Sequence, residues 1–159
     1  MAAFLTNAHV YRCIAEEALA EMTRLDAAAK RPKPDRSPGF VIQLDPEHTS
    51  FKSALIAIAF SGIYLEALLF VHGTFRMGAT WEEQFDRKPY EEKLKALSIT
   101  DEMLLGSAKR LRKARRELVH EKARPLEAVD RSKIYWAQSE AREAVAFIQA
   151  IAAMLTNAG

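Results

Sequence analysis

The sequence predicts an all-α fold, an up-and-down bundle of four main helices with one or two short helices between them. Apolar residues make up 49% of the 159-residue chain, and glycine and proline number only six each, a composition that favours helices over strands. Long stretches without helix-breaking residues carry apolar side chains at helical spacing. Four of the six prolines fall between residues 31 and 47, so this segment separates the first helix from the others.

The length and the cysteine content predict one cytoplasmic domain. A chain of this size builds a single sizeable core, so residues 1–159 are expected to form one domain. Cys13 is the single cysteine and has no partner for an internal disulfide, which is typical of a reducing compartment. The N-terminal residues contain no basic segment followed by an apolar run, so we expect no signal peptide.

The first helix is expected from Ala3 to about Lys30, unless Thr6 or Asn7 caps it and delays its start by a few residues. The proline-rich connection from Arg31 to Glu47 follows, and its segment Phe40–Leu44 is expected to lie as a short extended piece against the bundle. The basic residues of this connection would extend a nucleic-acid surface, but a solvated loop is the simpler interpretation.

The central helix is expected from Phe51 to about His72, after a cap at Thr49 or Ser50. Its stretch from residue 53 to residue 71 has nineteen residues and one charge, Glu66, which is close to the length of a membrane span. The charge within it and the lack of a second hydrophobic segment argue against a span. A helix that is apolar on all sides fits the middle of a bundle, so we expect no membrane association.

Glu66 needs a partner because a buried carboxylate is costly unless it is paired with a charge or hydrogen-bonded. A candidate lies on the later basic helix, whose apolar stripe includes Leu104, Ala108 and Leu111. Arg115 falls only about 40° from Leu111 around that helix, on the side that faces the core. We therefore hypothesise a Glu66–Arg115 ion pair that holds the guanidinium in place. The alternative is a surface Glu66 on a helix that is less buried than its composition suggests.

Two short helices are expected in the connection after the central helix, which begins with glycines. Thr80–Glu83 resembles a capped helical turn, and Pro89 is a good first residue for a helix over Tyr90–Leu97.

Two long helices are expected to complete the bundle. The first begins at Thr100–Glu102 and ends near Lys122, and the second runs from Val129 to Asn157. Tyr135 and Trp136 near the start of the last helix are candidates for stacking on unpaired bases, although packing in the core or in a dimer interface is the simpler interpretation.

The most basic stretch of the chain runs from Lys109 to Arg124. It holds eight Lys and Arg residues against two Glu, a net charge of +6 in a chain whose net charge is +2. A local positive field of this kind is the footprint of a phosphate-rich partner. We predict that Arg112, Arg116, Lys122 and Lys109 bind RNA phosphates. The alternative is a solvated basic helix without chemistry, because Lys and Arg are common near helix C-termini.

Arg115 and His120 lie in the same stretch. The guanidinium group of Arg115 can bind phosphate oxygens, and the imidazole of His120 can accept and donate a proton near neutral pH. In a straight helix they are about 140° apart, so a bend or a second copy of the chain is needed to bring them together. The sequence contains no cluster of Asp, His and Cys at metal-ligand spacing and no glycine-rich phosphate loop. We therefore expect chemistry without a metal or a cofactor.

The segment Arg115-Arg116-Glu117-Leu118-Val119-His120 resembles the R-x(4–6)-H motif of HEPN domains. These are small all-helical proteins, and many of them are metal-independent ribonucleases that act as dimers. The similarity covers roughly residues 49 to 158.

This resemblance implies a homodimer in which two motifs form one RNA-cleaving cleft. His120 would act as general base or acid on the ribose 2′-hydroxyl or the leaving oxygen, and Arg115 with Arg116 would hold the scissile phosphate. The alternative function is a catalytically inactive helical dimer that binds RNA, a nucleotide or a protein partner. HEPN relatives often pair with a nucleotidyltransferase-like antitoxin, and this chain would be the toxin-type subunit of such a pair.

Overall fold

The computed structural model describes residues 6–43, 47–119 and 136–157. Within these ranges the chain forms four long helices, two short helices and a two-stranded hairpin, so the all-α prediction is confirmed. In chain order the elements are α1 (Ala8–Ala29), β1 (Lys30–Pro32), β2 (Phe40–Ile42), α2 (Thr49–Met77), α3 (Ala79–Phe85), α4 (Tyr90–Ala96), α5 (Glu102–Val119) and α6 (Trp136–Asn157).

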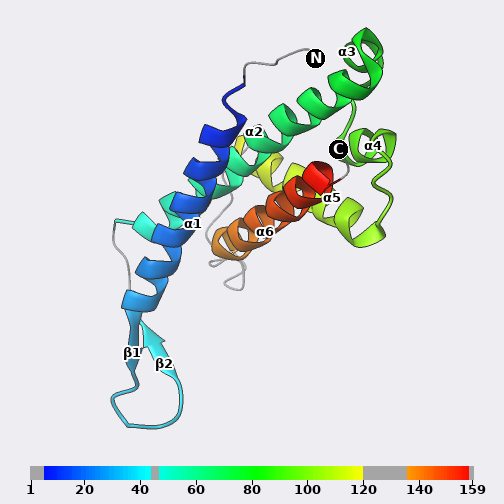
Figure 1. Cartoon of the computed structure of the whole chain (residues 1–159). Coiled ribbons are helices and arrows are strands. Elements are labelled where there is room, and N and C mark those ends of the chain that lie inside the picture. The colour runs from blue at the N-terminus through cyan, green and yellow to red at the C-terminus, as the bar shows by residue number, and fades with distance from the viewer. Residues whose placement is uncertain (1–5, 44–46, 120–135, 158–159) are drawn as a thin grey trace.

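The central helix α2 packs against each of the other five described helices. α1 runs alongside it, and α6 lies next to α2 on another side (Figure 1). Its apolar residues are buried in more than one direction, which explains why this helix lacks a polar face. Of the described helices, α2 alone is long and apolar enough to cross a membrane. The core around it includes Met22 of α1 and Ile148 and Ile151 of α6, all fully buried.

The predicted break at Gly73 is wrong, because α2 continues through this glycine to Met77. Gly73 is buried, and a Cβ atom there would overlap the indole ring of Trp81. Because Gly73 has no side chain, the Trp81 ring can pack directly against the backbone of α2. The same ring stacks on Phe85, with ring centroids 5.2 Å apart. The helix ends instead at Gly78, whose φ of 61° favours glycine.

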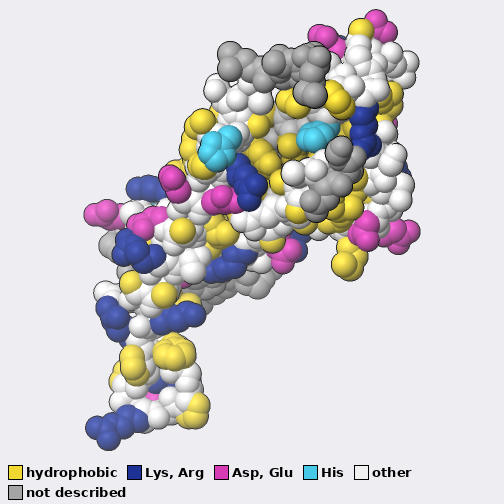
Figure 2. Space-filling view, in the orientation of Figure 1, with side chains coloured by type: hydrophobic (Ala, Val, Ile, Leu, Met, Phe, Trp, Pro, Cys, Tyr) yellow, Lys and Arg dark blue, Asp and Glu magenta, His cyan; other side chains and the backbone are white. Residues whose placement is uncertain are grey.

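The proline-rich connection forms a hairpin and does not lie against the bundle as predicted. β1 and β2 pair antiparallel, with Lys30 opposite Ile42 and Pro32 opposite Phe40, and the residues of both strands are exposed. The hairpin projects away from the helices (Figure 1), and Figure 2 shows hydrophobic and basic side chains on it. The chain leaves α1 in an extended conformation at Lys30, so the first strand follows directly and finds its partner in Phe40–Ile42.

The remaining helix boundaries are close to those predicted. α1 begins at Ala8, whose N–H donates to the Thr6 hydroxyl at 3.1 Å, so the delayed start is confirmed. α5 begins after Asp101, whose carboxylate accepts the Leu104 N–H at 2.9 Å. Trp136, the first residue of α6, is partly buried against the core. Residues 129–135, predicted as the start of the last helix, lie outside the described residues.

Two of the helical glycines, Gly73 and Gly106, predict opposite responses to alanine. Gly73→Ala forces a methyl group against the Trp81 ring, so we expect a loss of about 1–3 kcal/mol in the free energy of unfolding. Gly106 on α5 has open space around it, so Gly106→Ala should add about 0.5–1 kcal/mol. Urea unfolding of both variants beside the wild type measures the difference; two changes of the same sign would contradict this account.

Candidate functional site

An open cleft lies where α2, α4 and α5 meet. Its volume is about 160 Å³, and it is lined by Glu66, Lys88, Pro89, Tyr90, Arg112 and Arg115. Three of these residues are cations and one is an acid, so the lining is positive on balance. Small clefts with several convergent cations suit oxyanions such as phosphate.

Arg115 of α5 reaches the cleft across α2 at Gly62. A Cβ atom at Gly62 would overlap the Arg115 side chain, so the stem of the arginine lies directly on the backbone of α2. Its Nη1 donates a hydrogen bond to the Tyr90 hydroxyl and lies 3.9 Å from Glu66 Oε1. The side chain remains 33% exposed. Arg115 is therefore fixed on one side and open to solvent on the other.

The predicted contact between Glu66 and Arg115 is present, but Lys93 is the closer partner of Glu66. Lys93 Nζ lies 2.8 Å from Glu66 Oε2, and the Lys93 side chain is only 5% exposed. Glu66 was expected to be buried, and this is wrong: its side chain is 44% exposed, because it lies at the rim of the cleft. The buried charge of the site is thus the ammonium group of α4, and Glu66 neutralises it.

Tyr90 is the hydrogen-bond acceptor that orients Arg115, and it is buried. Burial raises the pKa of Tyr90 to about 12, with the positive charge of Arg115 opposing the rise and Glu66 adding to it. The phenol is therefore neutral near physiological pH, where it accepts from the guanidinium without transferring a proton. Its role is to position Arg115.

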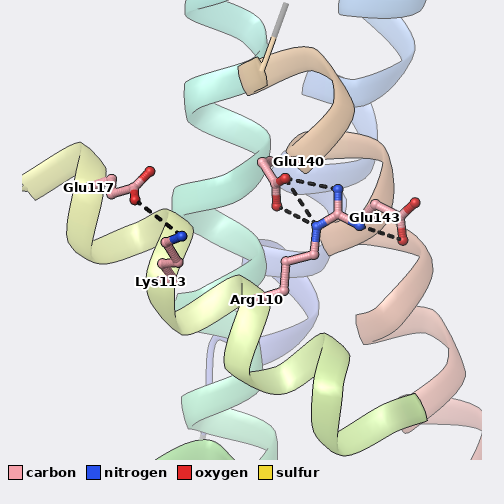
Figure 3. Close-up of polar contacts among 5 residues, drawn as sticks. All are labelled: Arg110, Lys113, Glu117, Glu140 and Glu143. Carbon is pink, nitrogen blue, oxygen red and sulfur yellow. Dashed lines mark hydrogen bonds and ion pairs between the residues drawn. The ribbon is translucent and has the colours of Figure 1, made fainter. Parts of the chain in front are cut away.

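Two other cations of α5, Arg110 and Lys113, are paired with acids of the chain (Figure 3). Arg110 donates three hydrogen bonds to Glu140 of α6, one at 3.0 Å and two at 2.8 Å, and approaches Glu143 at 3.7 Å. Lys113 lies 3.9 Å from Glu117 on its own helix. Arg110 therefore ties α5 to α6, and much of the charge in this part of the basic stretch is neutralised within the chain.

The residues predicted to bind RNA differ in their surroundings. Arg112 lines the cleft but is paired with Glu91 of α4, Nη2 to Oε1, at 2.9 Å. Lys109 is exposed, and its charge acts on Glu91 without a close ion pair. Arg116 is exposed and has no ion pair with a residue that the structure describes. Besides Arg115, the cations of α5 without a close ion pair among the described residues are therefore Lys109 and Arg116.

His120 and Lys122, predicted as a catalytic and an RNA-binding residue, lie outside the described residues. In the sequence, His120 directly follows Val119, the last residue of α5.

Sequence reasoning missed Tyr90, Lys93 and Glu91, all on the short helix α4. A signal for Lys93 was available: Tyr90, Lys93, Leu94 and Leu97 share one face at helical spacing, and all four are buried. A lone lysine in an apolar stripe needs an acid, just as the lone Glu66 in α2 needs a cation. Matching these two isolated charges would have predicted their contact.

The described residues contain no group of three or more His, Cys, Asp and Glu side chains placed to hold a metal ion. Comparisons of the chain with protein-family models, curated proteins and solved structures found no match. The chemistry of the cleft itself therefore carries the functional argument.

The Glu66–Lys93 pair predicts an asymmetric response to substitution. Glu66→Gln leaves a buried ammonium without its carboxylate, so we expect a loss of about 1–3 kcal/mol in the free energy of unfolding. Lys93→Met keeps the volume and removes the buried charge, while Glu66 keeps water and Arg115 as neighbours. This variant should lie within about 1.5 kcal/mol of the wild type. Chemical denaturation of both variants tests the order, and a more severe loss in Lys93→Met would contradict it.

The Arg112–Glu91 pair predicts acid sensitivity. Burial alone raises the pKa of Glu91, but the hydrogen bond from Arg112, its own backbone and the nearby cations bring the net pKa below its usual value. A lowered folded-state pKa gives stability that is present above the unfolded-state value of about 4.3 and is lost as the pH falls through the folded-state value. We expect the unfolding free energy of Glu91→Gln to fall less than that of the wild type between pH 6 and pH 3.

The exposed neighbour Glu92, 3.4 Å from Lys88, supplies the matched control, because Glu92→Gln also removes one carboxylate from α4. Parallel pH profiles for Glu91→Gln and the wild type would refute the assignment.

Proposed function

We propose that this chain is a metal-independent endoribonuclease that acts as a homodimer, with Arg115 and His120 as the catalytic residues. One observation carries the proposal: the Arg115 guanidinium is held in an open, cation-lined cleft by Tyr90 and Glu66, five positions before His120 in the chain. A phosphate-binding arginine that is already oriented loses little conformational freedom when it meets its ligand.

The proposed reaction needs a group that binds the scissile phosphate and two proton transfers. The scissile phosphate occupies the cleft, where Arg115 stabilises the charge that develops on its oxygens. His120 of one subunit removes the proton of the ribose 2′-hydroxyl, and the 2′-oxygen attacks the phosphorus. The 5′-oxygen of the next nucleotide leaves and takes a proton from the acid form of His120 in the second subunit. The products are a 2′,3′-cyclic phosphate and a free 5′-hydroxyl.

The other cations have graded roles in this proposal. Arg112 is held by Glu91, so a phosphate must compete with that carboxylate and Arg112 is a secondary contact. Lys109 and Arg116 are exposed on α5 and suit the flanking phosphates of the strand, as does Lys122 by its place in the sequence. This gives an RNA contact centred on the cleft and narrower than the whole basic stretch.

A second candidate function is a catalytically inactive helical dimer that binds RNA, a nucleotide or an antitoxin-type protein partner. The observation in its favour is that Arg110, Arg112 and Lys113 all have acidic partners within the chain. A helix whose cations are paired with acids of its own chain has less positive surface for catalysis on RNA.

Cleavage of structured RNA in EDTA separates the two functions. We expect the wild type to cleave, and His120→Ala and Arg115→Ala to lose at least about 100-fold in rate, the usual contribution of a general base or an oxyanion-stabilising group. Replacing the 2′-hydroxyl at the cut site by hydrogen should abolish cleavage there, because the nucleophile is lost.

Lys113→Ala is the matched control, since it removes a cation from the same helix, outside the cleft lining, and should retain full activity. Wild-type protein that binds RNA but leaves it intact would favour the inactive dimer. Equal cleavage by His120→Ala and the wild type would rule out the proposed mechanism.

A further inference from the structure

A second cavity, which we call the side pocket, adjoins the cleft at Glu66. Its volume is about 390 Å³, and its walls come from the start of α1, the second half of α2, the α3–α4 connection and α4. This is within the range of pockets that bind small organic groups. Glu66 lines both cavities, so the carboxylate that approaches Arg115 is also a wall of the side pocket.

Two features of the chain place the cleft and the side pocket next to each other. Gly62, where Arg115 crosses α2, precedes Glu66 by four residues, and Phe70 of the side pocket follows it by four. Each step of four residues is about 6 Å along a helix, so the three positions form one stripe on α2. The connection between α3 and α4 contributes Asp86 to the side pocket and Lys88 to the cleft.

The walls of the side pocket suit a flat, partly apolar group. Tyr11 of α1 and Phe70 of α2 supply aromatic rings, and Ala67 and Val71 supply aliphatic surface. Aromatic side chains with open faces hold unpaired nucleic-acid bases by stacking. Phe70 is exposed, so its ring is accessible from solvent.

Among the polar groups of the side pocket, Asp86 and Asn7 can supply hydrogen-bond acceptors to a ligand. The Lys93 ammonium is already bound by Glu66. Asp86 is exposed and has no hydrogen bond or ion pair with a residue in the described part of the chain. Asn7 stands at the start of α1, and its side chain does not cap the helix. The pocket therefore presents a carboxylate with two acceptor oxygens, and an amide, to a ligand.

We propose that the side pocket binds the base next to the scissile phosphate and prefers guanine. The inference rests on the proposed function and adds base recognition to it. The Watson–Crick edge of guanine carries two adjacent N–H donors, which match the two oxygens of one carboxylate. Adenine and cytosine offer an amino group without a second adjacent donor. Uracil presents carbonyl oxygens on either side of its single N–H, and these repel a carboxylate.

Two measurements test this base pocket. The first maps the cut sites that the wild type produces in a pool of random RNA in EDTA; we expect guanine to be enriched at one position beside the cut. The second measures binding of 2′-O-methyl dinucleotides, which lack the nucleophile, to the His120→Ala protein. A dinucleotide with guanine should bind about tenfold more tightly than its uracil counterpart, the discrimination typical of one bidentate contact.

Asp86→Asn should remove the guanine preference in both measurements, because an amide replaces one acceptor oxygen with a donor. Phe70→Ala should weaken binding of every dinucleotide, because it removes a stacking surface. Glu83→Gln is the matched control, since Glu83 is an exposed acid of α3 outside the side pocket, and it should behave as the wild type. Circular dichroism and thermal unfolding verify that each variant is folded.

The outcomes for the base pocket and for the ribonuclease are distinguishable. Cleavage without base preference, unchanged by Asp86→Asn, would overturn the base pocket and leave the ribonuclease intact. If the wild type does not cleave, the ribonuclease proposal is lost and dinucleotide binding alone decides the pocket. Equal binding of the guanine and uracil dinucleotides, or a guanine preference that survives in Asp86→Asn, would then overturn it.

Discussion

The contact between Lys93 and Glu66 is the constraint on which the cleft depends. An ammonium that is almost fully buried is stable only with a partner, and Glu66 is that partner at 2.8 Å. The pair fixes α4 against α2 at one place, and Tyr90, three residues before Lys93, is fixed with it. Because Tyr90 accepts the hydrogen bond of Arg115, the position of the guanidinium depends on the Lys93–Glu66 ion pair, from which Arg115 is more distant at 3.9 Å.

The second constraint is the use of glycine within α2. A helix that contacts the five other helices of the described residues must let some of them approach closely, and Gly62 and Gly73 are the places where this happens. Arg115 occupies the space left at Gly62, and Trp81 occupies the space left at Gly73. Both glycines cost helix stability in isolation. At Gly62 this loss of helix stability is offset by the packing of Arg115. Its aliphatic part lies on the backbone of α2 and its guanidinium reaches the cleft.

The fold was predictable from local patterns, whereas the site was predictable only in part. Helical periodicity located α1, α2, α5 and α6, because the spacing of apolar residues within each segment predicts a helix without reference to the rest of the chain. The angular position of Arg115 on α5 correctly predicted a contact with Glu66. Lys93 was missed because each helix was considered alone and the pairing of two isolated charges is a property of two elements.

The same reason explains the remaining errors. Gly73 was interpreted as a helix end because its packing partner, Trp81, belongs to a later helix. Phe40–Ile42 was expected against the bundle because its strand partner, Lys30–Pro32, was divided between the end of the first helix and the proline-rich connection and was not predicted as a strand. The homodimer and the RNA partner stay predictions, and the role of His120 rests on the sequence.

The ion pairs within the chain reduce the positive charge that the basic stretch, Lys109–Arg124, presents to a partner. Counted along the sequence, its charges sum to a strong positive field, but Arg110 and Arg112 are committed to Glu140 and Glu91. An electrostatic field estimated from the sequence assumes that each charge is solvated and unpaired. The potential of two opposite charges a few ångströms apart is close to zero beyond a Debye length of about 8 Å.

Arg115 is the exception among the paired cations, because its partners are a neutral phenol and a carboxylate that a closer lysine already neutralises. Its charge is therefore the least cancelled of the cations fixed in the cleft. A group that is immobilised but not neutralised is what an oxyanion site requires. Arg115, five residues before His120, meets this requirement, whereas Lys109 and Arg116 are exposed and are not fixed by a described partner.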